Sequence, residues 1–259
     1  FGVIGRDPWG AELLRVLGNE RTDLAGMVRQ DRDWSTVAYV KPHVDGIEQN
    51  RLDFGDFNRL DDATADHLVD ALESAMRSLD AVVINAQARC GIHSARLQQR
   101  LRHLIRTCPE TLFIVDSRDP QTMYEGCVLK INAAEAARCC AVADVSVEGL
   151  SREQALDATA RLFRKRGHPV FVTRGHEGIA ACNDDGLVEI PAIPLGDQVD
   201  TTGAGDAALS GIVVTLASGG GLFQAASAGN LAAAVFAAKA LKDASAPLQG
   251  DLLLCIPCD

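Results

Sequence analysis

The stretch Val199-Asp200-Thr201-Thr202-Gly203-Ala204-Gly205-Asp206-Ala207-Ala208 joins a glycine-rich turn to an apolar segment, residues 209–217, that has the composition of a helix. Gly203 and Gly205 let the backbone turn tightly. The unpaired N–H groups of a helix's first turn, together with its dipole, suit an anion. Asp206 stands in the same turn, where a carboxylate repels a phosphate but can accept a proton from an attacking hydroxyl. An anion site beside a base is the arrangement that phosphoryl transfer needs.

An alternative interpretation of the same turn is an ordinary helix start that binds no ligand. In a lone Gly-x-Gly-Asp, the aspartate can simply complement the dipole of an ordinary helix, and short glycine motifs match by chance often. The rest of the chain therefore has to decide between a helix start and a reaction site.

The composition allows one large core, or one domain with a small appendage, and argues against some partners. The chain has 259 residues, of which 47% are hydrophobic, enough for a sizeable core. A net charge of −10 and a pI near 5.0 argue against nucleic acid as the main partner, although a local arginine cluster can still bind a phosphorylated substrate. No apolar run approaches the roughly 20 residues of a membrane span, and no signal peptide pattern is present. We expect a cytoplasmic protein with no membrane partner.

The eight cysteines and six histidines do not form a metal-binding pattern. Cys255-Ile-Pro-Cys258 has the CxxC spacing, but no second pair or histidine cluster completes four zinc ligands. In a long, core-rich chain, reduced and buried thiols are the expected state.

From residue 61 onward, short apolar runs alternate with amphipathic helical stretches. This alternation predicts βαβ units and a mainly parallel sheet flanked by helices, in a single α/β domain over residues 1–259. Ser151 and Gln154 form a capping-box pattern, and Gly167 is a helix stop. The predicted strands are residues 81–85, 112–116, 127–132 and 169–174.

Residues 34–54 break the α/β pattern. Two β-rich runs flank Asp45-Gly46, a dipeptide that favours a tight hairpin turn. The alternation of Ile47, Gln49, Arg51 and Asp53 indicates a sheet with one solvated face. We expect a small β element separate from the main sheet.

Polar residues follow the predicted strands at the point where each one ends. Ligands of open parallel sheets bind beyond the carboxyl ends of the strands. Each residue could instead cap the next helix or turn, but several of them at one edge, beside the Gly203 turn, indicate a site. They are Asn85, Asp116 with Arg118, Asn132 with Glu135, and Thr173-Arg174-Gly175.

The string Asp-Thr-Thr-Gly-Ala-Gly-Asp at residues 200–206 resembles the signature of the ribokinase-like (PfkB) carbohydrate kinases, which transfer the γ-phosphate of ATP to a sugar hydroxyl. The resemblance implies a ribokinase-like fold in which residues 34–54 form a small β lid. It also implies ATP and Mg²⁺ as cofactors. Among partners, we expect a second copy of the chain, bound through the lid. It makes Asp206 the catalytic base and Gly203, Ala204 and Gly205 the anion hole.

The same resemblance assigns nucleotide and metal contacts. Asn132-Ala-Ala-Glu135 resembles the family's Asn-x-x-Glu motif, so Asn132 and Glu135 are the expected Mg²⁺ residues, acting largely through water. The expected cofactor-binding residues are Asn132, Thr173, Arg174, Gly175, Gly178, Thr202 and Asn230.

Two segments resemble one branch of the family, the heptose-7-phosphate kinases that form the kinase half of ADP-heptose synthase. They are residues 113–119 and the Arg-Leu-Asp-Phe at residues 51–54. Heptose 7-phosphate is therefore the first expected substrate, and a ribose- or fructose-type sugar the second. The expected substrate-binding residues are Arg51, Asn85, Arg89, Asp116 and Arg118.

Ser117-Arg118 replaces the Pro-Lys of that branch, and because arginine and lysine are not equivalent at a phosphate, this exchange bears on which sugar is bound. Two other departures keep an alternative function open. Ala86 replaces an aspartate of that branch, and the family's N-terminal portion with its sugar-binding aspartate does not precede Phe1. The alternative is a non-catalytic relative that keeps the fold and binds a nucleotide or a sugar, and we expect the N-terminal part of the fold to be missing.

Overall fold

The computed structural model describes residues 1–44, 47–88, 90–119, 124–142, 150–194 and 202–245. The chain divides into two compact units. The first contains Phe1–Leu79 and Asn85–Pro109, and the second contains Asp80–Ile84 and Glu110–Leu253. The first unit contains three two-stranded sheets, and the second contains the six-stranded sheet.

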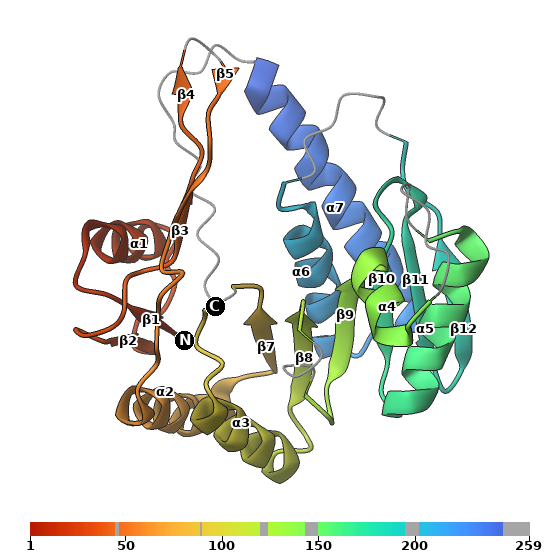
Figure 1. The fold of residues 1–259 in the computed structure, drawn as a ribbon. Helices are drawn as coiled ribbons and strands as arrows, with labels where there is room; N and C mark the ends of the chain where they lie inside the picture. Colours follow the sequence, from red (N-terminus) through yellow and green to blue (C-terminus); the bar gives the residue numbers. More distant parts are fainter. Residues whose placement is uncertain (45–46, 89, 120–123, 143–149, 195–201, 246–259) are drawn as a thin grey trace. The chain divides into compact units, whose positions relative to one another are not determined.

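The second unit holds a six-stranded sheet with the strand order β12-β11-β10-β9-β8-β7 (Figure 1). Strands β8, β9 and β10 run parallel, whereas β11 and β12 add an antiparallel hairpin at one edge. The mainly parallel sheet expected from the sequence is confirmed, but the hairpin was not predicted. The strands are β7 (Ala81–Ala86), β8 (Leu112–Ser117), β9 (Val128–Asn132), β10 (Val170–Thr173), β11 (Ile179–Asn183) and β12 (Gly186–Ile190).

Helices cover both faces of this sheet (Figure 1). Helices α4 (Ala133–Cys140) and α5 (Arg152–Arg166) lie on one face, and α6 (Ala204–Ala217) and α7 (Leu222–Ser245) on the other. In strand β10, Val170, Phe171 and Val172 are fully buried, as a parallel strand covered on both faces requires. The core between the sheet and the α6–α7 layer includes Ile114, Phe171, Ile179, Leu209, Ile212, Ala225 and Ala226.

Helix α5 follows its sequence signals closely. The Ser151 side chain accepts a hydrogen bond from the backbone N–H of Gln154. The Gln154 side chain in turn accepts one from the backbone N–H of Ser151. Gly167 ends the helix in the left-handed conformation, with φ of 68°. The capping box and the stop that the sequence predicts are both confirmed.

The first unit holds shorter elements. Strand β1 (Gly2–Ile4) pairs in parallel with β2 (Met27–Arg29), and the two form a sheet of their own. Its helices are α1 (Pro8–Asn19), α2 (Asp62–Ala75) and α3 (Ala95–Thr107), with a 3₁₀ turn, η1 (Met76–Ser78), after α2.

Asp7 joins the end of β1 to the start of residues 34–54. One carboxylate oxygen accepts a hydrogen bond from the Gly10 N–H at 2.8 Å and so caps α1, while the other accepts one from the Thr36 N–H at 2.8 Å. The Thr36 hydroxyl in turn accepts a hydrogen bond from Gly5 N–H at 2.9 Å. One half-buried aspartate thus fixes a helix start and the base of the next β element.

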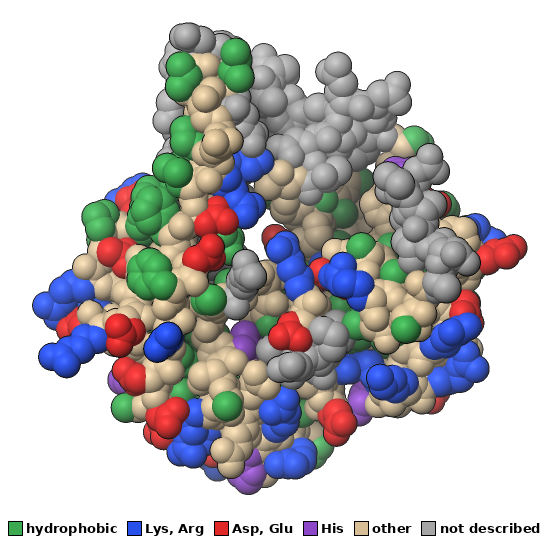
Figure 2. Space-filling view, in the orientation of Figure 1, with side chains coloured by type: hydrophobic (Ala, Val, Ile, Leu, Met, Phe, Trp, Pro, Cys, Tyr) green, Lys and Arg blue, Asp and Glu red, His purple; other side chains and the backbone are tan. Residues whose placement is uncertain are grey.

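Residues 34–54, the lid segment, form two short antiparallel ladders that do not join the six-stranded sheet. Strand β3 (Ala38–Val40) pairs with β6 (Leu52–Phe54), and β4 (His43–Val44) pairs with β5 (Ile47–Glu48). The separate β element is therefore present, while the Asp45-Gly46 turn lies outside the described residues. Apolar side chains are exposed along it, Val44, Ile47 and Leu52 among them (Figure 2).

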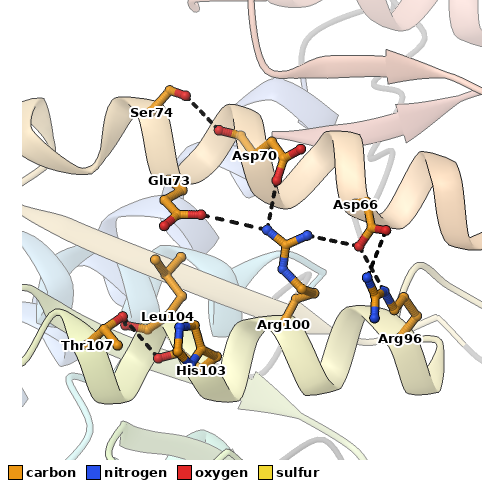
Figure 3. A network of polar contacts seen from close by, with 9 residues as sticks. All are labelled: Asp66, Asp70, Glu73, Ser74, Arg96, Arg100, His103, Leu104 and Thr107. Carbon is orange, nitrogen blue, oxygen red and sulfur yellow. Dashed lines mark hydrogen bonds and ion pairs between the residues drawn. The ribbon is translucent and has the colours of Figure 1, made fainter.

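An ion-pair network joins α2 to α3 (Figure 3). The Arg100 guanidinium lies 2.9 Å from an Asp66 oxygen and 2.7 Å from an Asp70 oxygen, and Glu73 is 3.6 Å away. Arg96 donates two further hydrogen bonds to Asp66. These hydrogen bonds, Arg96 first, lower the pKa of Asp66. Arg96 and Arg100 of α3 thus help to hold the two helices together. On the face drawn in Figure 2, acidic and basic side chains are interspersed over these two helices.

Replacing Arg100 tests this network. Arg100→Met should lower the free energy of unfolding by about 1 kcal/mol, because a half-buried guanidinium that bridges three carboxylates is worth slightly more than a surface pair. The effect should shrink in high salt. Urea unfolding measures it, with Arg106→Met on the exposed side of the same helix as the matched control. Equal losses in the two variants would show that the network adds nothing.

Candidate active site

The glycine turn before α6 is confirmed as a helix start. Gly203 is the N-cap with φ of 80°, and a Cβ on it would lie 2.8 Å from the Phe236 ring. Both the conformation and the lack of space require glycine there. The first helical hydrogen bond runs from Ala207 N–H to Gly203 O, so the N–H groups of residues 204–206 precede it. The exposed Asp206 and Thr202 flank this turn, while residues 195–201 lie outside the described part.

A buried ion pair lies against the same turn. The Lys130 ammonium is 2.6 Å from Asp116 Oδ2, and the two side chains are 6% and 2% exposed. A Cβ on Gly205 would lie 3.3 Å from Lys130 Nζ, so the ammonium borders the first turn of α6. Burial raises the pKa of Asp116; the charge of Lys130 opposes the rise and that of Asp206 adds to it. Two carboxylates and one ammonium therefore share the end of the sheet.

Asn132 and Glu135 begin α4 as a reciprocal capping box. The Asn132 side chain accepts a hydrogen bond from Glu135 N–H at 2.9 Å, and Glu135 Oε2 accepts one from Asn132 N–H at 2.7 Å. The second carboxylate oxygen, Oε1, lies 4.0 Å from the guanidinium of Arg118, which is 66% exposed. The Asn-x-x-Glu pattern thus builds a helix start, and its Oε1 faces the exposed, cationic side chain of Arg118.

The end of β10 forms a tight turn. The Thr173 hydroxyl donates weakly to Ile131 O, at 3.4 Å. Arg174, expected at the nucleotide, is instead 2% exposed and directs its guanidinium to Glu189 Oε1 at 2.7 Å. Glu189 also binds the exposed Arg152. Through Glu189 of β12, Arg174 thus takes part in an ion-pair network that joins the end of β10 to β12 and α5.

Two glycines of that turn differ in their surroundings. Gly178 has φ of 95°, and a Cβ on it would lie 2.0 Å from Ile190 O, whereas Gly175, with φ of 58°, has nothing within 4 Å of its Cβ position. Asn230 on α7 donates a hydrogen bond to Pro191 O at 2.8 Å, which ties α7 to the end of β12. The Asn230 amide thus makes a structural hydrogen bond.

The remaining predicted residues belong to the first unit. Arg51 makes two hydrogen bonds to Asp53, at 2.6 and 2.7 Å, and stacks over the Tyr39 ring. Asn85 has a buried Oδ1 with no hydrogen-bond partner among the described residues. Its carbonyl contacts the ring of His93, whose pKa is lowered by burial. Arg89 lies outside the described residues.

Sequence reasoning missed Lys130 and Glu189. The signal for Lys130 was a single lysine inside the apolar run Val128-Leu-Lys-Ile131, because a cation in a buried strand needs a partner. Nothing in the sequence indicated Glu189, since its partners Arg152 and Arg174 come from elements far apart in the chain.

The part of the chain that the structure describes contains no cluster of three or more metal-ligating side chains and no helix long and apolar enough to cross a membrane. Its six cysteines are free thiols, and burial raises the pKa of Cys127 to about 12. Such a thiol is not a nucleophile at neutral pH. Cys255 and Cys258 lie outside the described residues.

The two glycines of the β10 turn give a matched test. Gly178→Ala should cost at least about 3 kcal/mol of unfolding free energy, because a left-handed φ and a backbone overlap act together. Gly175→Ala should cost only about 1 kcal/mol, for the conformation alone. Urea unfolding of both variants measures the difference. Equal costs would contradict the close approach of Gly178 to β12.

Comparison with known proteins places this arrangement in a family. The bifunctional protein HldE of Caulobacter sp. is 27% identical over 244 residues, which are 92% of this chain and 47% of that protein. HldE of Azorhizobium caulinodans is also 27% identical, over 92% of this chain and 49% of its own length. The chain therefore spans about half the length of the curated relatives it matches.

Solved structures agree on the fold. Phosphofructokinase-2 from Escherichia coli, in complex with potassium, superimposes with a TM-score of 0.69 at 17% identity, over 91% of this chain and 74% of that one. Aminoimidazole riboside kinase from Salmonella enterica gives 0.63 at 18% identity, over 92% and 78%. The ribokinase-like fold expected from the sequence is confirmed, and this chain is shorter than those neighbours. The pfkB family carbohydrate kinase model matches residues 1–248, and the chain belongs to that family.

Proposed function

We propose that this chain carries an ATP-dependent phosphotransferase activity whose acceptor is a hydroxyl of a sugar or sugar phosphate. One observation carries the proposal: the exposed Asp206 stands in the first turn of α6, next to Gly205, which borders the buried ammonium of Lys130. A base, a helix N-terminus and a cation together are the parts that phosphoryl transfer needs. Membership of the carbohydrate kinase family supports the same reaction.

In the proposed reaction, the acceptor hydroxyl gives its proton to the Asp206 carboxylate. The hydroxyl oxygen forms a bond to the γ-phosphorus of ATP as the bond to the bridging oxygen breaks, and ADP leaves. Backbone N–H groups of Ala204, Gly205 and Asp206 offset the charge on the transferred group. The base and the N–H groups thus both come from the start of α6.

The residues at the start of α4 fit Mg²⁺. Glu135 has a carboxylate oxygen beyond the one used in the capping box, and hard oxygen donors that act through water suit this cation. We assign Glu135 and Asn132 to hold it, with Asn132 fixing the position of Glu135. When bound, Mg²⁺ would neutralise phosphate charge.

The nucleotide side of the site is proposed at the β10 turn and α7. Thr173, Gly175 and Gly178 form one side and Asn230 the other, with Thr202 before α6. Arg174 is proposed to shape the turn through Glu189, since its guanidinium is already paired there.

The finer proposal concerns the acceptor. Heptose 7-phosphate is supported by the resemblance of residues 51–54 and 113–119 to heptose-7-phosphate kinases. A fructose-type sugar phosphate is the second choice, supported by a structural neighbour solved with fructose-6-phosphate. We propose Asp116 and Arg118 in the second unit, and Arg51, Asn85 and Arg89 in the first, as substrate residues. The buried, unpartnered Oδ1 of Asn85 supports its role.

A homodimer through the lid segment is part of the same proposal. The exposed Val44, Ile47 and Leu52 give the segment an apolar surface, which favours contact with another protein surface. Phosphofructokinase-2 from Escherichia coli has been solved in a tetrameric form.

The Asp206→Asn variant tests the base. The amide has nearly the same shape but cannot accept the proton, so kcat should fall about 10²–10⁴-fold. ATP affinity should change little or rise, because a negative charge near the γ-phosphate disappears. Steady-state phosphorylation of a panel that includes heptose 7-phosphate and fructose and ribose sugars, at fixed Mg²⁺ and ATP, measures kcat. Asp157→Asn, an exposed aspartate of α5, is the matched control and should leave kcat unchanged.

The same assay separates the second candidate function, a non-catalytic nucleotide- or sugar-binding relative. The replacement of an expected aspartate by Ala86, which is buried here, favours that candidate. It predicts that Mg²⁺-ATP binds, as calorimetry would detect, while no sugar of the panel is phosphorylated. A parent enzyme that turns over, with an Asp206→Asn variant within threefold of it, would instead remove Asp206 from the mechanism.

A further inference from the structure

Asp116 and Lys130 occupy directly opposed positions on neighbouring strands. They are register partners in the parallel pair β8–β9, and their charged groups are 2.6 Å apart. Both strands are apolar around them, and neither side chain is more than 6% exposed. The pair is therefore withdrawn from water at the carboxyl end of the sheet.

Stability does not explain such a pair. Removing two charges from water costs several kcal/mol each, and replacement of a buried pair by apolar residues of similar volume is often neutral or stabilising. On the same face of β8 and β9, two positions before the ion pair, Ile114 and Val128 belong to the buried apolar core, so a Met or Leu would have apolar neighbours there. The charges must serve a purpose that apolar residues cannot.

The location indicates that purpose. Lys130 Nζ stands 3.3 Å from the Cβ position of Gly205, at the helix end where N–H groups are available to an anion. A methyl group on Gly205 would press on the ammonium, so glycine keeps the two in close approach. The Lys130 ammonium thus binds the Asp116 carboxylate next to a helix start whose N–H groups can bind an anion.

We propose that Asp116 acts as an internal competitor for phosphate, and that Lys130 changes partner from Asp116 to a phosphate group when a polyphosphate enters the turn before α6. The inference rests on the proposed function only in taking that polyphosphate to be the nucleotide. A phosphate brings more charge than a carboxylate, and the flexible four-carbon stem of lysine can follow it. Arg118 is 66% exposed, lies 4.0 Å from Glu135, and its charge acts on Asp116, so a cation stays near that carboxylate after the exchange. The exchange separates Asp116 from Lys130 at the place where its sugar contact is proposed.

Calorimetric binding of inorganic tripolyphosphate, ATP and adenosine to the complete 259-residue chain tests the exchange. Lys130→Met should weaken tripolyphosphate and ATP about tenfold or more and leave adenosine unchanged. Asp116→Asn, which removes the competitor but keeps its shape, should strengthen tripolyphosphate by a similar factor. The matched control is Arg161→Met, an exposed arginine of α5, which should change neither. A merely structural pair would weaken every ligand in both variants.

The ammonium itself gives a test that needs no Asp116 variant to fold. The ¹⁵N resonance of the Lys130 ammonium, assigned by its absence in Lys130→Arg, should move when tripolyphosphate is added to the parent protein. A resonance that stays fixed while tripolyphosphate binds would overturn the proposal, and so would a folded Asp116→Asn variant whose tripolyphosphate affinity is unchanged or lower. These measurements do not depend on turnover, so their outcome distinguishes a failure of the exchange from a failure of the proposed sugar phosphorylation.

Discussion

The register of the parallel strands β8, β9 and β10 is the constraint on which the site depends. It pairs Asp116 with Lys130 and Asn132 with Thr173, so four polar side chains from three strands end at one edge of the sheet. A slip of one residue would turn each of these side chains to the other face. The apolar interiors of the strands prevent that slip because both faces are covered by helices. The same packing that builds the core therefore aligns the polar groups.

Backbone geometry supplies the second part of the site. Gly203 and Gly178 adopt left-handed conformations and also leave no room for a side chain, since the Phe236 ring and Ile190 O occupy the space. Each glycine permits a close approach between elements distant in sequence: α7 meets the start of α6, and β12 meets the turn after β10. The turns around the proposed phosphate site are thus packed against elements outside them.

Several polar side chains serve the fold and remain compatible with the proposed reaction. Asn132 and Glu135 build a capping box with one carboxylate oxygen to spare. Arg174, in contrast, directs one terminal nitrogen to Glu189 and to Glu177 O, and the Asn230 amide donates to Pro191 O. A motif residue can therefore act indirectly, through the turn or helix that it holds, and the position of its side chain decides which role it takes.

The sequence by itself determined the family, the alternation of strands and helices, and the local signals. The 200–206 string, the Ser151 capping box, the Gly167 stop and the polar strand ends are all short-range patterns, and short-range patterns depend on backbone propensity and spacing that a sequence displays. Only the tertiary structure decided which charges meet. Lys130 and Asp116 are 14 residues apart, Arg174 and Glu189 are 15 apart, and Arg152 and Glu189 are 37 apart. Partners at such separations are chosen by strand order and register, which depend on the packing of the whole core rather than on any local stretch.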